Sequence, residues 1–125
     1  MSNKWTYEQN LAIHTKWINS EKTESKNILV NAAAGSGKTA VLVERIINKV
    51  CSDVNSSDFC DVTNLLVVTF TNAAAKQMQQ RIYDALSKKY IKAQSENDMD
   101  ACIHLKEQMS LVYLADITTI DAFCL

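Results

Sequence analysis

The sequence predicts an α/β fold in which a parallel sheet is flanked by helices. Along its 125 residues, apolar runs typical of strands alternate with apolar residues at helical spacing, and this order is typical of parallel sheets with right-handed crossovers. The composition, 47% hydrophobic and 22% charged, is that of a globular chain, and proline is absent. We therefore expect a buried core made mostly of helices and strands.

The first fifty residues predict two helices and one strand. The segment Thr-Tyr-Glu-Gln at 6–9 fits a capping box, so a helix should run from there to about Asn19. Residues 27–31 read as a short buried strand that leads into an Ala- and Gly-rich turn at 32–37. A second helix should follow this turn. Its apolar residues at helical spacing are Leu42, Val43, Ile46, Ile47 and Val50.

The remaining residues predict two strands and two helices. Residues 52–64 are rich in Ser, Asp and Asn and should form a surface connection to a second buried strand at 65–69. A helix should begin near Asn72, and after a polar break at 93–100 another should follow, with a third strand at 117–120. The expected core faces of the two helices are Met78, Ile82 and Leu86, and Cys102, Leu105, Met109 and Val112.

Charge and cysteine content exclude several classes of protein. Thirteen Lys and Arg residues against fourteen Asp and Glu residues give a net charge of -1, which argues against a wholly basic binder of nucleic acid. No apolar run is as long as a membrane span and no secretory leader is visible, so we expect a cytoplasmic protein. The four cysteines are far apart, and we expect reduced thiols in or near the core.

Residues 32–39, Ala-Ala-Ala-Gly-Ser-Gly-Lys-Thr, match the phosphate-binding P-loop pattern, with Ala32 where the strict pattern has Gly. Gly35 and Gly37 allow a tight turn that brings backbone N–H groups to a phosphate. Lys38 supplies a positive charge, and the Thr39 hydroxyl is a ligand for Mg²⁺. A strand expected before the loop and a helix after it favour nucleotide binding over an ordinary glycine turn.

Three further segments indicate which class of P-loop protein the chain resembles. They are Trp-Thr-Tyr-Glu-Gln at 5–9, Thr-Phe-Thr-Asn-Ala-Ala-Ala-Lys-Gln-Met at 69–78, and Ile-Thr-Thr-Ile-Asp-Ala-Phe at 117–123. With the P-loop, this ordered set resembles the start of the UvrD/Rep-type, superfamily-one DNA helicases over essentially the whole chain. The likeness is greatest to the helicase–nuclease subunits of recombination-repair complexes. It implies a RecA-like P-loop NTPase fold, with ATP and Mg²⁺ as cofactors and single- or double-stranded DNA as substrate.

The resemblance assigns the upstream glutamine, Gln9, to the adenine edge; the alternative is that Gln9 only completes the capping box with Thr6. Lys38 and Thr39 take the catalytic roles in this assignment. The expected nucleotide-binding residues are Gln9, Ala32, Ala33, Ala34, Gly35, Ser36, Gly37, Lys38, Thr39 and Ala40.

Two motifs of the family contact DNA. In the first, Thr71 and Asn72 could cap the next helix and contact phosphates, and Phe70 could stack on a base or instead lie in the core. In the second, the contacts are Thr118 and Thr119. Many relatives have His where this chain has Asp121, which cannot donate to a phosphate at neutral pH, so its alternative role is the N-cap of a helix beginning at Ala122.

The apolar end of the sequence and the resemblance together predict a part of a longer protein. We expect residues 1–125 to form the N-terminal part of a UvrD-like helicase ATP-binding domain, with the remaining motor and nuclease domains absent. The whole protein would be an ATP-dependent 3′–5′ DNA helicase with exonuclease activity, with a partner subunit, in double-strand break repair and recombination.

We expect the 125-residue chain to be inactive by itself, because the acidic pair that completes the metal site in the family is missing. The sequence leaves two alternatives to a helicase. A small-molecule kinase would need phosphate-binding arginines, and only Arg45 and Arg81 are available. A stand-alone nucleotide-binding module would bind without turnover.

Overall fold

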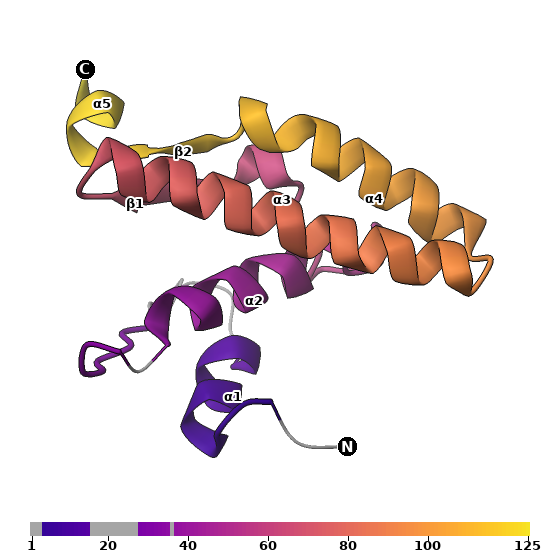
Figure 1. Cartoon of the computed structure of the whole chain (residues 1–125), viewed down its shortest axis with the longest axis horizontal. Coiled ribbons are helices and arrows are strands. Elements are labelled where there is room, and N and C mark those ends of the chain that lie inside the picture. Colours follow the sequence, from indigo (N-terminus) through magenta and orange to yellow (C-terminus); the bar gives the residue numbers. More distant parts are fainter. Residues whose placement is uncertain (1–3, 16–27, 36) are drawn as a thin grey trace. The chain divides into compact units, whose positions relative to one another are not determined.

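The computed structural model describes residues 4–15, 28–35 and 37–125, and they form helices joined to a small parallel sheet (Figure 1). The chain divides into two compact units, Met1–Arg45 and Ile46–Leu125. The boundary between the units lies within helix α2 (Lys38–Val50).

In the first unit, helix α1 (Tyr7–His14) begins as the sequence predicts. Thr6 is its N-cap and both halves of the capping box are formed. The helix ends earlier than predicted, because Thr15 has a ψ of 122°, which is outside the helical range. The rest of the predicted helix, residues 16–19, lies outside the described residues.

The predicted strand at 27–31 is wrong for the residues that the structure describes. Residues 28–33 have no strand assignment, and Leu29 is 92% exposed; Asn27 lies outside the described residues. A strand is stabilised by backbone hydrogen bonds to a neighbouring strand. Within the described residues, the sheet consists of two strands that pair with each other, so the apolar residues of 28–30 have no sheet in which to be buried.

Helix α2 confirms the predicted helix after the turn, with one correction to its apolar face. Val43, Ile46, Ile47 and Val50 are buried, whereas Leu42 is exposed. Leu42 lies about a quarter turn from the centre of the buried stripe, at 100° per residue, and this places it at the edge of the stripe.

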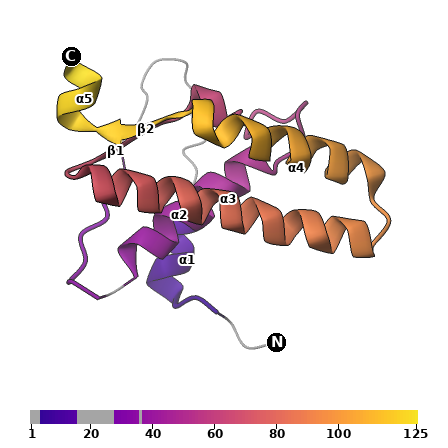
Figure 2. The same ribbon diagram turned by 45° about the horizontal axis from the view of Figure 1, so that its top comes forward.

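In the second unit, strands β1 (Leu66–Thr69) and β2 (Asp116–Thr119) pair in parallel, from Leu66 with Asp116 to Thr69 with Thr119. Helix α3 (Asn72–Ser95) packs on this sheet, and helix α4 (Met99–Leu111) lies beside α3 (Figures 1 and 2). The predicted stripe of α3 is confirmed. The large buried apolar side chains of this layer include Met78, Ile82, Leu86, Leu105 and Val112.

The burial of β1 and several boundaries in the second unit differ from the predictions. Val67 is the one buried residue of β1, because α3 packs on the sheet and successive strand side chains point to opposite faces. The polar break is shorter than expected, since α3 continues to Ser95 and α4 begins at Met99. The third predicted strand ends at Thr119, and Ile120 starts helix α5 (Ile120–Cys124).

Two short 3-10 helices, η1 (Val62–Asn64) and η2 (Val112–Leu114), precede β1 and β2. The segment before η1 is irregular, as predicted for a surface connection, although Val62 is buried. Cys51, Cys60 and Cys102 are half-buried, but Cys124 is exposed and does not lie in the core. Among the residues described here, no helix is both long enough and apolar enough to span a bilayer.

Candidate nucleotide-binding site

The glycine turn before α2 has the backbone conformation that its sequence predicts. Gly35 has a φ of 80° and Gly37 a φ of 84°, values that favour glycine because a Cβ would be strained there. Ser36, which lies between them, is outside the described residues. This backbone leads directly into the first turn of α2.

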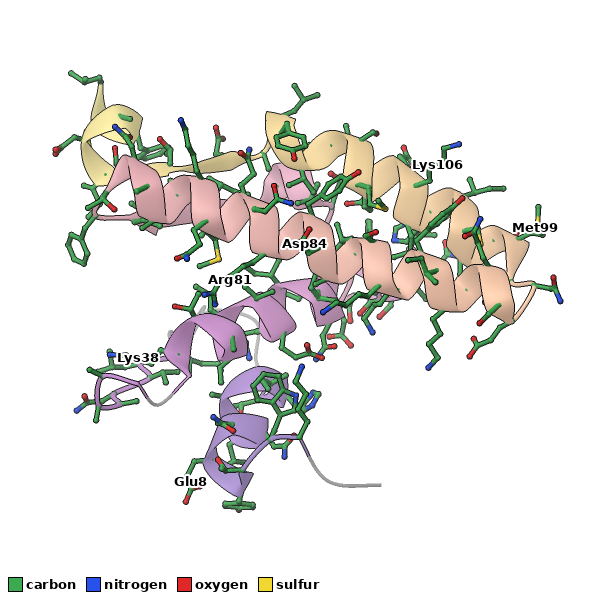
Figure 3. The ribbon with its side chains drawn as sticks, viewed as in Figure 1. Glu8, Lys38, Arg81, Asp84, Met99 and Lys106 are labelled. Atoms are coloured by element: carbon green, nitrogen blue, oxygen red, sulfur yellow. The ribbon has the colours of Figure 1, made fainter. Side chains whose placement is uncertain are left out.

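Helix α2 begins at Lys38, so Lys38, Thr39 and Ala40 form its first turn (Figure 3). The first N–H groups of a helix have no acceptor within the helix and form its positive end. This turn contains no acidic residue, and both Lys38 and Thr39 are exposed. The arrangement can therefore present N–H groups, an ammonium group and a hydroxyl group to an anion.

A cavity of about 290 Å³ adjoins this turn within the first unit. Lys38 and Ala32 lie on its wall, and its apolar lining includes Ala12, Val30 and Val41. Such a mixture of apolar surface and a few polar groups is typical of small-ligand sites. The lining residues are Thr6, Glu8, Gln9, Ala12, Val30, Asn31, Ala32, Lys38 and Val41.

Gln9 caps α1 and also lies close to the glycine turn. Its Oε1 accepts a hydrogen bond from the Thr6 N–H at 2.8 Å, and its own N–H donates to Thr6 Oγ1 at 3.2 Å. Its Nε2 lies 3.2 Å from the position that a Cβ on Gly37 would occupy. The capping interpretation of Gln9 is therefore confirmed, and it does not remove the residue from the candidate site.

Arg45 has a structural role that its sequence context does not predict. Its Nη1 donates to the backbone oxygens of Ala12 at 3.0 Å, Ile13 at 3.2 Å and Thr15 at 3.0 Å. These carbonyls form the C-terminal end of α1, where a positive charge is stabilising. The only sequence signal was an arginine one turn after Val41 on a largely apolar helix.

The first predicted DNA motif forms the corner between β1 and α3, residues 70–72. Phe70 is 92% exposed, so the alternative in which it belongs to the core is wrong. Thr71 caps α3 as predicted, because its Oγ1 accepts from the Ala74 N–H at 3.1 Å. Asn72 is the first residue of α3 and is exposed.

The second predicted DNA motif lies beside the first, because β2 pairs with β1. Thr118 is half-buried. Thr119 is 8% exposed, and its Oγ1 accepts from the Ala122 N–H at 3.1 Å as the N-cap of α5. The N-cap role proposed for Asp121 is thus wrong: α5 starts as soon as β2 ends, so Asp121 already lies in its first turn.

The basic residues of the segment 76–92 lie on the solvent-exposed surface of α3. Lys92 forms an ion pair with Glu96 at 3.9 Å, and the side chains of both are well exposed. Arg81 and Asp84 project from the same helix (Figure 3). The five basic residues, all exposed, are Lys76, Arg81, Lys88, Lys89 and Lys92.

Known proteins are similar to this chain over most or all of its length. The family model described as the UvrD/REP helicase N-terminal domain matches residues 14–125. An ATP-dependent helicase/nuclease subunit of Clostridium perfringens (strain 13) is 49% identical over 125 residues, 100% of this chain and 8% of the relative. Proteins of the same name from Lachnoclostridium phytofermentans and Bacillus cytotoxicus are each 53% identical, over 82% and 80% of this chain and 7% of each relative. The chain thus spans less than a tenth of the length of these relatives.

Proposed function

Because this chain belongs to the UvrD/REP helicase N-terminal domain family, we propose that it forms the ATP-binding part of an ATP-dependent 3′–5′ DNA helicase/nuclease subunit of the AddA type. The names of its relatives, which are ATP-dependent helicase/nuclease subunits, support this assignment. The whole protein would act on DNA in double-strand break repair and recombination, with exonuclease activity. It would work in the cytoplasm with an AddB-type partner subunit.

The observation that carries the proposal is the turn with two glycines at positive φ that leads directly into the first turn of α2. In a RecA-like P-loop fold this turn holds the phosphates of ATP. The backbone N–H groups and the Lys38 ammonium would neutralise them, and the Thr39 hydroxyl would be the protein's ligand to Mg²⁺. The metal would supply charge neutralisation of the phosphates.

The adjoining cavity supports a place for the base. Gln9 lies on its wall with Ala12, Val30 and Val41, and an amide can pair with an adenine edge while apolar side chains cover the ring.

Thr39 is the one metal ligand that the P-loop pattern supplies. We therefore expect the isolated chain to bind Mg·ATP weakly and to hydrolyse it negligibly, since no residue of the motif activates water.

The experiment that tests the proposal is a titration of a fluorescent ATP analogue into the wild-type chain and the Lys38→Ala variant. Loss of the charge-assisted contact should weaken binding by about 1.5–3 kcal/mol, roughly tenfold or more. Lys49→Ala is the matched control, because Lys49 lies in the last turn of the same helix. Equal affinities for wild type and Lys38→Ala would contradict the assignment.

The kinase alternative is not favoured. Arg45, the one arginine in the first unit, binds three backbone carbonyls of α1. Family membership and the names of the relatives also favour a helicase over a stand-alone nucleotide-binding module.

A further inference from the structure

Gln108 of α4 is the largest polar side chain among the fully buried residues that the structure describes, with 1% of its surface exposed. Both ends of its amide form hydrogen bonds to a segment more than forty residues earlier. Its Oε1 accepts from the Val62 N–H at 2.9 Å, and its Nε2 donates to Asp61 Oδ2 at 2.9 Å. A buried amide is costly unless both ends are paired, so these two bonds fix one orientation of the side chain.

The segment held by this amide is the turn η1. Asp61 caps it, with Oδ1 accepting from the Thr63 N–H at 2.9 Å and from Thr63 Oγ1 at 2.6 Å. The hydrogen bonds from Thr63 and then from Gln108 lower the pKa of Asp61, so the carboxylate is the form that this arrangement stabilises. Val62 is 1% exposed. Gln108 thus fastens an ordered turn to α4.

The fastened turn leads almost directly to the corner at 70–72. The Leu65 N–H donates to the Val62 oxygen at 3.3 Å and closes η1, and β1 begins at the next residue. β1 has only four residues, so a displacement of its first residue also displaces its last residue. There Thr69 Oγ1 donates to the Thr71 oxygen at 3.0 Å, which links the strand end to the cap of α3.

We propose that Gln108 is a positioning residue for the corner at 70–72: by clamping η1 it fixes where β1 starts and hence where Phe70 is presented. The inference rests on the proposed function and on the expectation, from the family resemblance, that this corner contacts single-stranded DNA. Gln108 itself is buried and does not contact the nucleic acid.

The first test compares the wild-type chain with Gln108→Leu. The substitution keeps the apolar contacts but leaves the Val62 N–H without an acceptor. Amide hydrogen exchange should accelerate at 62–72 while α1 and the centre of α3 keep their protection. Anisotropy of a labelled single-stranded oligonucleotide should show binding weakened by roughly threefold to tenfold.

The second test uses Gln108→Glu and pH. The new carboxyl would face Asp61 Oδ2 at hydrogen-bond distance, and two carboxylates there cannot both ionise, so its pKa is raised in the folded chain. Its stabilising, protonated form is fully present below the unfolded pKa of about 4.3 and is lost as the pH rises through the folded pKa. Oligonucleotide affinity should therefore be weaker at about pH 8 and recover towards wild type at about pH 5.5.

Two controls accompany the pH series. Gln80→Glu is matched, because Gln80 Nε2 also donates to a carboxylate, Asp84 Oδ1, at 2.9 Å, but on the exposed surface of α3; it should show no such recovery. The wild-type chain is measured at both pH values because His104, one turn before Gln108 on α4, also acts on Asp61 through its charge.

The outcomes distinguish the positioning role of Gln108 from DNA binding at the corner 70–72. The positioning role would be overturned by exchange that accelerates throughout the second unit, or by an equal loss of DNA affinity at both pH values in Gln108→Glu. A wild-type chain that binds no oligonucleotide would refute the DNA site. In that case, faster exchange at 62–72 in Gln108→Leu would still support the role of Gln108 in holding η1, and unchanged exchange there would overturn it.

Discussion

Substitutions of Gln9 should separate its role in capping from its role in base recognition. Gln9→Ala removes the acceptor for the Thr6 N–H, a 2.8 Å bond, and should lower the free energy of unfolding by about 0.5–1 kcal/mol. Gln9→Glu keeps an acceptor for that N–H but removes the Nε2 donor that lies near Gly37. Its stability should therefore fall less than that of Gln9→Ala, because the Thr6 N–H keeps its acceptor.

Base selectivity should respond differently. If the amide reads adenine, losing one neutral hydrogen bond of about 0.5–1.5 kcal/mol should lower the ratio of ATP to GTP affinity by roughly twofold to tenfold in both variants. The added negative charge of Gln9→Glu acts on the phosphates of both nucleotides and cancels in that ratio. The assay is a pair of nucleotide titrations for each variant, beside a thermal melt.

Thr6→Ala provides the control. It removes the Oγ1 that accepts from the Gln9 N–H at 3.2 Å without changing the amide, so stability should fall while the affinity ratio is unchanged. An ATP/GTP ratio that stays constant in both Gln9 variants would refute base recognition and leave Gln9 as a capping residue alone.

Three further results are expected. Gly35→Ala and Gly37→Ala should both be strained by about 1–3 kcal/mol, because both positions have positive φ. Gly37→Ala should lose more nucleotide affinity than Gly35→Ala, because its Cβ would lie 3.2 Å from Gln9 Nε2, whereas a Cβ on Gly35 has no neighbour within 4 Å. Equal losses of affinity in nucleotide titrations would contradict this. Phe70→Ala should change stability by less than about 0.5 kcal/mol, because the ring is 92% exposed, yet weaken oligonucleotide binding by about 1–3 kcal/mol. In a salt series the log–log slope should be shallow, at about 0.7 per phosphate contacted; unchanged oligonucleotide affinity would argue against stacking. Finally, hydrogen bonds led by Thr63 lower the pKa of Asp61, so its stabilisation is present above the unfolded pKa and lost as the pH falls through the folded pKa. Asp61→Asn should flatten acid unfolding below about pH 4, and an identical acid transition in both chains would contradict it.

The helices and their caps could be predicted from sequence because their signals are local. Thr6 and Gln9 form the capping box that their spacing indicates, and Thr71 caps α3. The apolar stripe of α3 is buried as predicted. Each of these features depends on residues three or four positions apart, which a helix brings together by its own geometry.

The exposure of strand-like residues could not be predicted in this way. Residues 28–30 and β1 have similar apolar sequences, yet β1 has a paired neighbour and 28–30 have none among the described strands. Phe70 could equally have been a core residue. A run of apolar residues indicates that burial would be favourable, but only the surrounding elements determine whether there is a surface against which these residues can pack.

By itself, the sequence determined an α/β chain, a glycine turn that matches the phosphate-binding pattern, and the family to which the chain belongs, because these depend on contiguous residues. Tertiary structure alone decided the roles of Arg45 and Gln108, whose partners lie 30–33 and 46–47 residues away. Both side chains satisfy backbone or carboxylate groups that packing removes from water. Which distant groups need such a partner is set by how the elements pack, and no local pattern in the sequence records it.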